Sequence, residues 1–356
     1  MPEGAGPPPP SSGGAGGPVV AFDALGAEGG AEVAVEGIGR AAADGIAVRA
    51  FGRPDELGDL AQLAGVEVIE APARIPNEIE PAAAVRSCSD ASIVRAAADV
   101  ADGSSDALAS PGSTGATMAA AVFALKRLRA VQRPALAVQI SSPAGGRPTL
   151  MLDVGANADN RSSHLVQFAY LGSAFAQAVL DFERPRVALL SVGEEAKKGS
   201  SLVVEAHSAL AEADGINFIG NVEGQQLLAG SAAEVIVTDG FTGNVALKTI
   251  EGTAKAVADA VRDAAGSSPK AGLGGLLLRG ALSGLRTRLD PDQTGGAILL
   301  GLRGVAVVGH GSAGPEGIAN QIRLAARAVS EDAVARTAEL LERSGAGRGA
   351  LRERDG

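Results

Sequence analysis

Short apolar runs alternate with longer segments of helical period along most of the chain, and each apolar run predicts a strand. Most runs are apolar at successive positions, so both faces of each strand are expected to be buried. Strands that alternate with helices in this way indicate an α/β fold, in which helices cover both faces of a largely parallel sheet. The predicted strands are Val19–Phe22, Ile46–Phe51, Val66–Ile69, Ala107–Ala109, Ala135–Ile140, Leu150–Val154, Val187–Val192, Ile216–Ile219, Val235–Thr238 and Val305–Val308.

The segment VIVTDGFTGNVALKTIEG, residues 235–252, predicts a buried strand, a turn with two glycines and a helix that continues to Ala260. Glycines let the backbone approach a ligand, and the unpaired N–H groups at a helix start attract an anion. This turn is therefore a candidate phosphate site, with an ordinary strand-to-helix turn as the alternative. Its candidate residues are Asp239, Gly240, Thr242, Gly243, Asn244 and Lys248.

Four more polar loops that contain glycine follow predicted strands. Because the carboxyl ends of parallel strands share one edge of a sheet, we expect these loops and the turn at Asp239 to lie together there. Each loop taken alone is equally consistent with a solvated connection. The candidate substrate-binding residues in these loops are Gly112, Ser113, Thr114, Gly115, Asp153, Asn157, Asp159, Glu194, Lys197, Lys198, Gly199, Asn221 and Glu223.

The segment Ser268–Pro291 differs from the rest, because it combines leucines, glycines and arginines. It is too short and too charged to span a bilayer, and it predicts one or two amphipathic helices with basic flanks that touch a membrane or a partner. A leucine-rich hairpin buried against a second subunit is the alternative. The candidate residues of this tip are Leu276, Leu277, Leu278, Arg279, Leu282 and Arg286.

The two ends contain little that can be buried. Residues 1–18 are rich in Pro, Gly and Ser, and residues 345–356 are rich in Gly and Arg, so both are predicted to be disordered. Residues 19–344 are expected to form the α/β domain.

Composition excludes several classes of function. The net charge of −10 and the aromatic content of 3% argue against nucleic-acid binding. The single cysteine, Cys88, cannot form an internal disulfide, and His164, His207 and His310 are too far apart in the sequence to suggest a metal site. We find neither a signal peptide nor a membrane span, so the expected location is the cytoplasm.

Taken together, the loops resemble a known family. The motifs LDVGANAD (152–159), HLVQFA (164–169), GEEAKKG (193–199), NFIGNVEG (217–224), VTDGFTGNVALKTIEG (237–252), GGAILLGLRG (295–304), HGSA (310–313) and ANQIR (319–323) occur in one order. They are similar to those of the PlsX family, the phosphate acyltransferases of bacterial phospholipid synthesis. That family makes acyl phosphate from acyl-acyl carrier protein and inorganic phosphate.

The resemblance implies a three-layer α/β/α fold similar to isocitrate dehydrogenase and phosphotransacetylase, a homodimer, and no metal or nucleotide cofactor. It also implies a helical tip that makes peripheral contact with the membrane, and a downstream glycerol-3-phosphate acyltransferase that uses the product. Five positions depart from the family pattern and place the activity in question: Ala27, Cys88, Ser113, Thr294 and Val308.

Acyl transfer from a thioester to phosphate requires a site that holds an anion beside the carbonyl and stabilises the oxyanion. The predicted catalytic residues are Asp239, Asn244, Lys248 and, as proton donor, His310. Arginines of the tip are candidates for docking the acidic carrier protein. Two alternatives are a phosphotransacetylase acting on short acyl-coenzyme A and a homologue that docks to membrane or carrier protein without turnover.

Overall fold

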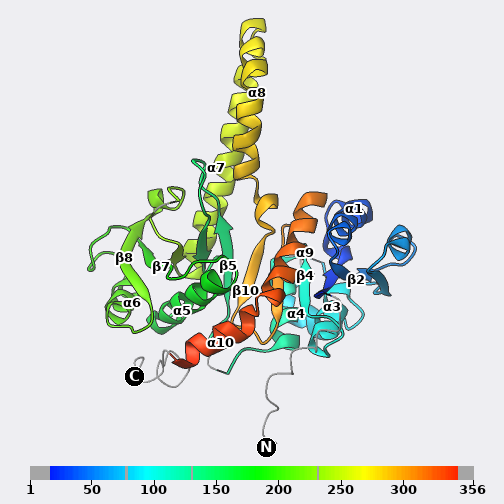
Figure 1. Ribbon diagram of the computed structural model, residues 1–356, viewed down its shortest axis with the longest axis horizontal. Helices are drawn as coiled ribbons and strands as arrows, with labels where there is room; N and C mark the ends of the chain where they lie inside the picture. The colour runs from blue at the N-terminus through cyan, green and yellow to red at the C-terminus, as the bar shows by residue number, and fades with distance from the viewer. Residues whose placement is uncertain (1–16, 77–78, 130, 231, 344–356) are drawn as a thin grey trace, which may run out of the picture.

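The computed structural model describes residues 17–76, 79–129, 131–230 and 232–343, and within them eleven strands form one sheet (Figure 1). The strand order is β3-β2-β1-β4-β11-β10-β5-β6-β9-β7-β8. Every predicted strand is present. The strands are β1 (Val19–Asp23), β2 (Ala47–Gly52), β3 (Val66–Glu70), β4 (Ala107–Ser110), β5 (Ala135–Ile140), β6 (Thr149–Leu152), β7 (Arg186–Ser191), β8 (Asn217–Glu223), β9 (Val235–Val237), β10 (Ala297–Leu300) and β11 (Val305–Val308).

Helices cover both faces of the sheet, which gives three layers and confirms the predicted fold class. The core on one face includes side chains of α1, α5, α6, α9 and α10, and the core on the other face includes those of α2, α3, α4 and α7. The helices are α1 (Gly30–Ala43), α2 (Pro81–Ser87), α3 (Ser92–Ala101), α4 (Thr114–Leu125), α5 (Ser162–Ala178), α6 (Ser201–Ala211), α7 (Gly240–Gly266), α8 (Pro269–Leu289), α9 (Pro315–Ser330) and α10 (Ala333–Arg343).

The two halves of the sheet run in opposite directions. Strands β3, β2, β1, β4 and β11 are parallel to one another, and so are β6, β9, β7 and β8. Between the halves, β11 with β10, β10 with β5 and β5 with β6 are antiparallel pairs. The carboxyl ends of the two halves therefore lie at opposite edges, and the expectation of five polar loops on one edge is wrong.

Strand β10 is the element that the sequence analysis did not predict. Its four apolar residues are followed by Gly301, which has a φ of +92° and begins the turn toward β11. The sequence analysis places these residues only in the motif GGAILLGLRG, and without β10 the reversal of the sheet could not be foreseen.

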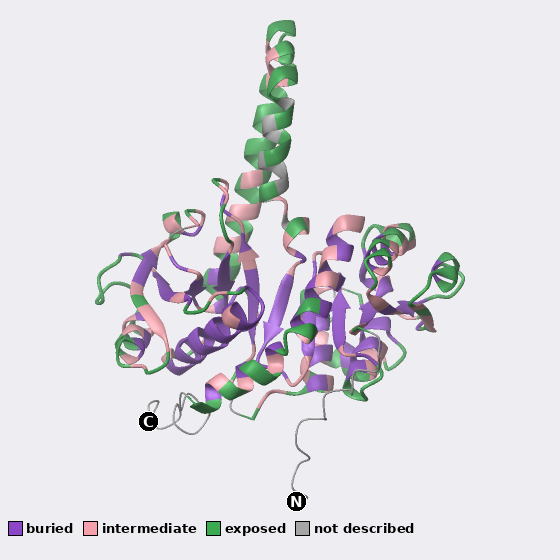
Figure 2. Ribbon diagram, in the orientation of Figure 1, coloured by how far each residue is buried: buried purple, intermediate pink, exposed green. Residues whose placement is uncertain are grey.

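The predicted tip is a helical hairpin that projects from the body of the molecule (Figure 1). Helix α8 forms one arm, and the second half of α7 forms the other, so residues 268–291 contain one helix. Figure 2 shows that exposed residues dominate the hairpin, whereas the central strands of the sheet are buried. Leu276, Leu277 and Leu278 are exposed, and Leu277 is 79% exposed. The side chains of Arg279, Leu282 and Arg286 lie outside the described residues.

In the part of the chain that the structure describes, no helix has the length and apolar character needed to cross a membrane.

Candidate active site

A cavity of about 270 Å³ opens on the face of the sheet that α4 and α7 cover. Its walls come from β5, from one side of α7 and from the loops that follow β1, β4 and β11. The cavity lies where the two halves of the sheet meet, because β10 and β5 form its floor. Segments distant in the sequence therefore contribute to one site.

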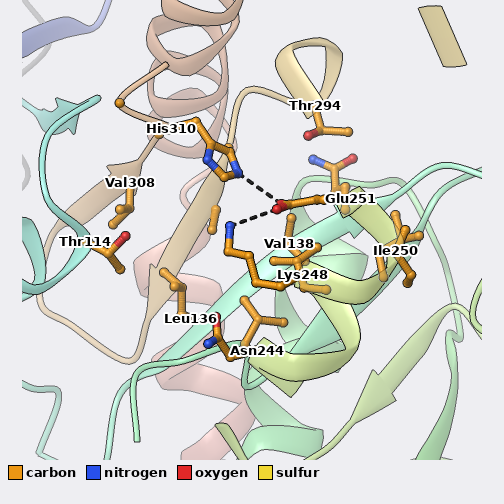
Figure 3. A pocket seen from close by; sticks show the side chains of 18 of the residues that line it. Thr114, Leu136, Val138, Asn244, Lys248, Ile250, Glu251, Thr294, Val308 and His310 are labelled. Carbon is orange, nitrogen blue, oxygen red and sulfur yellow. Dashed lines mark hydrogen bonds and ion pairs between the residues drawn. The ribbon is translucent and has the colours of Figure 1, made fainter. Parts of the chain in front are cut away.

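Three ionisable side chains form a chain of contacts at the mouth of this cavity (Figure 3). Lys248 Nζ lies 2.8 Å from Glu251 Oε2, and His310 Nε2 lies 3.0 Å from Glu251 Oε1. The residues at 248 and 251 are three apart on α7, so they lie on one side of the helix. His310 arrives from the loop after β11, and the catalytic candidates Lys248 and His310 are thus brought together.

The environment of Glu251 favours its charged form. Burial opposes ionisation, but the hydrogen bonds from His310 and Lys248 outweigh burial, so the pKa of Glu251 lies below its usual value. The Glu251 side chain is 20% exposed, whereas that of Lys248 is 52% exposed and can turn toward an incoming anion.

The amino end of α4 also lines the cavity, through Gly112, Ser113 and Thr114. Ser113 is the N-cap residue, and its side chain makes no capping hydrogen bond to the helix. A helix start carries partial positive charge, so this end of α4 and Lys248 together favour an anion in the cavity. Gly115 lies one residue further on and packs against Pro81.

A buried carboxylate fixes the loop that leads into α4. Asp23 at the end of β1 accepts hydrogen bonds from the hydroxyl groups of Ser92 and Ser110, and Ser110 Oγ in turn accepts one from the N–H of Gly112 at 3.0 Å. Burial raises the pKa of Asp23. Through Ser110 and Gly112, this network fixes the position of the β4–α4 loop.

The start of α7 is closed, in contrast to that of α4. The N–H of Gly240 donates to Asn160 Oδ1 at 3.1 Å, and that of Thr242 donates to the carboxylate of the N-cap residue Asp239 at 2.9 Å. A Cβ on Gly240 would overlap the carbonyl oxygen of Asn157. The expectation of unpaired amides open to a ligand is therefore wrong for Gly240 and Thr242, and the glycines here allow close packing.

The loop that follows β6 packs against the start of α7. Asp153 is fully buried and accepts hydrogen bonds from the backbone of Leu136, Gly155, Ala156 and Asn157, and from the Asn157 amide. Burial raises the pKa of Asp153, although these donors work against it. Asp153, Asn157 and the exposed Asp159 do not line the cavity. Asp153 and Asn157 instead fix the loop that packs against the start of α7.

The loops after β7 and β8 begin at the edge of the sheet opposite the loop after β4. Leu228, in the segment after β8, lines the cavity, whereas the predicted site residues of these loops do not. Glu194 accepts a hydrogen bond from Gln226, and Asn221 donates to the carbonyl of Glu195 and contacts His207. Glu223 caps a short helical turn. Lys197, Lys198 and Gly199 are exposed. The structure does not bring these loop residues together with Lys248 and His310.

Comparison with known proteins identifies the family of this chain. The sequence profile of a family described as "Fatty acid synthesis protein" matches residues 19–336. A phosphate acyltransferase of Lacticaseibacillus casei (strain BL23) is 43% identical over 276 residues, which are 77% of this chain and 80% of that protein. A phosphate acyltransferase of Heliobacterium modesticaldum is 43% identical over 289 residues, covering 80% of this chain and 85% of that protein. This chain belongs to the phosphate acyltransferase family.

Solved structures of low sequence identity share the fold of this phosphate acyltransferase. The EutD phosphotransacetylase from Staphylococcus aureus has a TM-score of 0.55 and 18% identity, covering 88% of this chain and 94% of that chain. A branched-chain phosphotransacylase from Enterococcus faecalis V583 has a TM-score of 0.56 and 15% identity, covering 87% and 98%. At these identities the similarity shows the fold alone.

Part of the wall of the cavity in this family member is apolar. Leu136, Val138 and Ile140 alternate along β5 and so project from one face of the strand. Opposite them, Leu247 and Ala254 belong to the side of α7 that also carries Asn244, Lys248 and Glu251. One cavity therefore combines charged and apolar side chains.

The sequence analysis missed several cavity residues. Glu251 lies within the matched motif, three positions after Lys248, and that spacing was the available signal. Arg74 also lines the cavity, from a loop that no motif marks, and so do Glu28 and the tip residue Arg288. Among the departures from the family pattern, Ser113, Thr294 and Val308 line the cavity, whereas Ala27 and Cys88 do not.

Proposed function

We propose that this phosphate acyltransferase transfers a long-chain fatty acyl group from acyl-acyl carrier protein to inorganic phosphate, forming acyl phosphate. The observation that carries the proposal is one cavity in which Lys248, His310 and the start of α4 adjoin apolar side chains of β5 and α7. Membership of the family supports phosphate as a substrate.

The charged side chains of the cavity suit the chemistry of the reaction. A phosphate dianion needs positive partners beside the thioester carbonyl, and the oxyanion that forms there needs hydrogen-bond donors. Lys248 offers the charge, and the backbone at Ser113 and Thr114 offers amides at a helix start. Asn244 lines the same cavity one turn before Lys248 and offers a side-chain amide as a further donor.

The apolar wall favours a fatty chain over an acetyl group. Val138, Ile140 and Ala254 lie on opposite walls, on β5 and α7, and would bury methylene groups, each of which contributes about 0.8 kcal/mol when transferred from water. An acetyl group would leave this wall without a partner.

The deciding assay measures phosphate-dependent release of thiol from a long-chain acyl-carrier protein, with direct identification of acyl phosphate. Acetyl-coenzyme A serves as the competing donor. Turnover of acetyl-coenzyme A at a rate equal to or above that of the long-chain donor would replace the proposal with a phosphotransacetylase activity.

Narrowing the apolar wall should change the preference for chain length. In Ala254→Leu, the larger side chain occupies space on the α7 side, so kcat/KM for a long-chain donor should fall about tenfold relative to that for a medium-chain donor. The matched control is Ala258→Leu, one turn further along α7 at an exposed position outside the cavity. Equal kcat/KM ratios for Ala254→Leu and the unchanged protein would remove this wall from acyl recognition.

The exposed leucines of the hairpin support peripheral contact with a membrane. Leu273, Leu276, Leu277 and Leu278 are all more than half exposed, and a cluster of that kind is typical of an interaction surface. Flotation with anionic vesicles should recover the unchanged protein and lose most of a Leu276→Glu/Leu277→Glu variant. Leu63→Glu, an exposed leucine outside the hairpin, is the control. Equal flotation of both variants would assign membrane contact to another surface.

A homodimer is supported by exposed apolar residues at the edge of the sheet where β7 and β9 end, opposite the loop after β4. Val192 follows β7 and Phe241 follows the neighbouring β9, and they are 81% and 67% exposed. A second copy of the chain is the partner we propose for this edge, and light scattering that gives the mass of a monomer would exclude it.

Acyl carrier protein as donor and a glycerol-3-phosphate acyltransferase as consumer of acyl phosphate complete the proposal, by family resemblance. Carrier docking at the basic residues of the hairpin is tested by a salt titration of binding in variants of Lys270 and Arg288.

A further inference from the structure

Glu251 holds two cavity side chains at once, one with each carboxylate oxygen. Oε2 contacts Lys248 Nζ and Oε1 contacts His310 Nε2, at 2.8 Å and 3.0 Å (Figure 3). Lys248 and Glu251 lie on the same helix, whereas His310 comes from the loop after β11. The carboxylate therefore ties the start of that loop to the wall of the cavity.

These contacts define the state of the imidazole. An ionised carboxylate only accepts hydrogen bonds, so His310 must donate through Nε2. In a neutral ring the hydrogen is then on Nε2, and Nδ1 is the atom left to gain or lose a proton. Val308, which precedes the His-Gly-Ser sequence, is apolar and lines the same cavity, so it supplies no alternative proton donor there.

We propose that Glu251 is a positioning residue that keeps the hydrogen on Nε2 of His310, so that Nδ1 carries the proton of phosphate to the leaving sulfur. The inference rests on the proposed function and deepens it. It extends to this chain the general logic by which a carboxylate orients a histidine that takes a proton from the nucleophile and returns it to the leaving group.

A phosphate oxygen attacks the thioester carbonyl carbon, the carbon–oxygen bond forms, and the hydroxyl proton of the phosphate passes to Nδ1. The carbon–sulfur bond then breaks, its electron pair goes to sulfur, and Nδ1–H returns the proton to give the thiol and acyl phosphate. No oxidant, metal or further reactant takes part. The alkyl thiol has a pKa near ~8.5, so proton return is useful near neutral pH.

The test compares two donors that carry the same acyl chain. One is an alkyl thioester such as the carrier thiol, and the other is an aryl thioester whose acidic thiol leaves as thiolate without a proton. In Glu251→Gln, kcat at saturating phosphate should fall about 10²-fold or more with the alkyl donor. With the aryl donor it should fall less than about fivefold. His310→Gln should show the same dependence on the leaving group.

Asp259→Asn is the matched control, because Asp259 is an acidic residue of α7 outside the cavity that pairs with Arg262 at 2.5 Å. It should leave kcat unchanged with both donors. Equal losses with the two donors in Glu251→Gln would overturn the inference and assign Glu251 a packing role or a role in holding Lys248. Unchanged rates with both donors would also overturn it. Lack of turnover by the unchanged protein would instead reject the proposed function.

Discussion

Lys248→Met should lower kcat/KM for phosphate by about 10²- to 10³-fold while the protein remains folded. The methionine keeps much of the length and apolar character of the lysine stem but removes the ammonium group. Lys248 lines the cavity beside the start of α4, so its charge acts on the anion and on the oxyanion that forms during transfer. The loss of one donor to the developing oxyanion accounts for the expected size of the effect.

The control for this experiment is Lys255→Met on the same helix. Lys255 is exposed and does not line the cavity, so kcat/KM should remain within about twofold. The measurement is phosphate-dependent thiol release over a range of phosphate concentrations. Retention of more than a tenth of the activity by Lys248→Met would remove this lysine from the mechanism.

Gly243→Ala should destabilise the protein by about 3 kcal/mol, the largest stability effect expected of a single methyl group in this chain. A Cβ at this position would overlap the carbonyl oxygen of Asp153, and the backbone of a helix start cannot rotate out of the way. The 153–157 loop would have to move, although Asp153 holds it through several hydrogen bonds.

Gly252→Ala is the opposite case on the same helix. No atom lies within 4 Å of a Cβ built there, and the position is exposed. Alanine should therefore stabilise α7 by about 0.5–1 kcal/mol through helix propensity. Urea unfolding of the two variants side by side gives the comparison. If Gly243→Ala has the same urea midpoint as the unchanged protein, the 153–157 loop can move away from α7 without a loss of stability.

Much of the fold could be predicted because the signals were local. Runs such as Val235–Val237 and Ala135–Ile140 are long enough and apolar enough to mark strands without knowledge of their neighbours. The reversal of the sheet could not be predicted, because it depends on β10 and on pairings between residues far apart in the sequence, such as Ala297 with Val138. Loop positions inferred from an all-parallel sheet were therefore wrong for one half.

The site was predicted in part for the same reason. Lys248 and His310 lie in recognisable motifs, and the structure places both at the cavity. The two helix starts looked equivalent in sequence, since each combines glycine with a hydroxyl residue. Which start is open depends on tertiary contacts: Asn160 reaches the amide of Gly240, whereas Ser113 caps nothing. Single polar side chains such as these do not alter the hydrophobic period of the sequence, so the period does not reveal their contacts.

Helix α7 is continuous from Lys248 to the far end of the hairpin, and its length sets the distance between the cavity and that end. At about 1.5 Å per residue, Gly266 lies roughly 27 Å along the axis from Lys248. One leaflet of a bilayer has a hydrocarbon depth of only about 15 Å. Under the proposed function, a fatty chain of about that length cannot reach from Lys248 to Gly266, so acyl phosphate would leave the cavity before its chain meets a membrane held at the end of the hairpin.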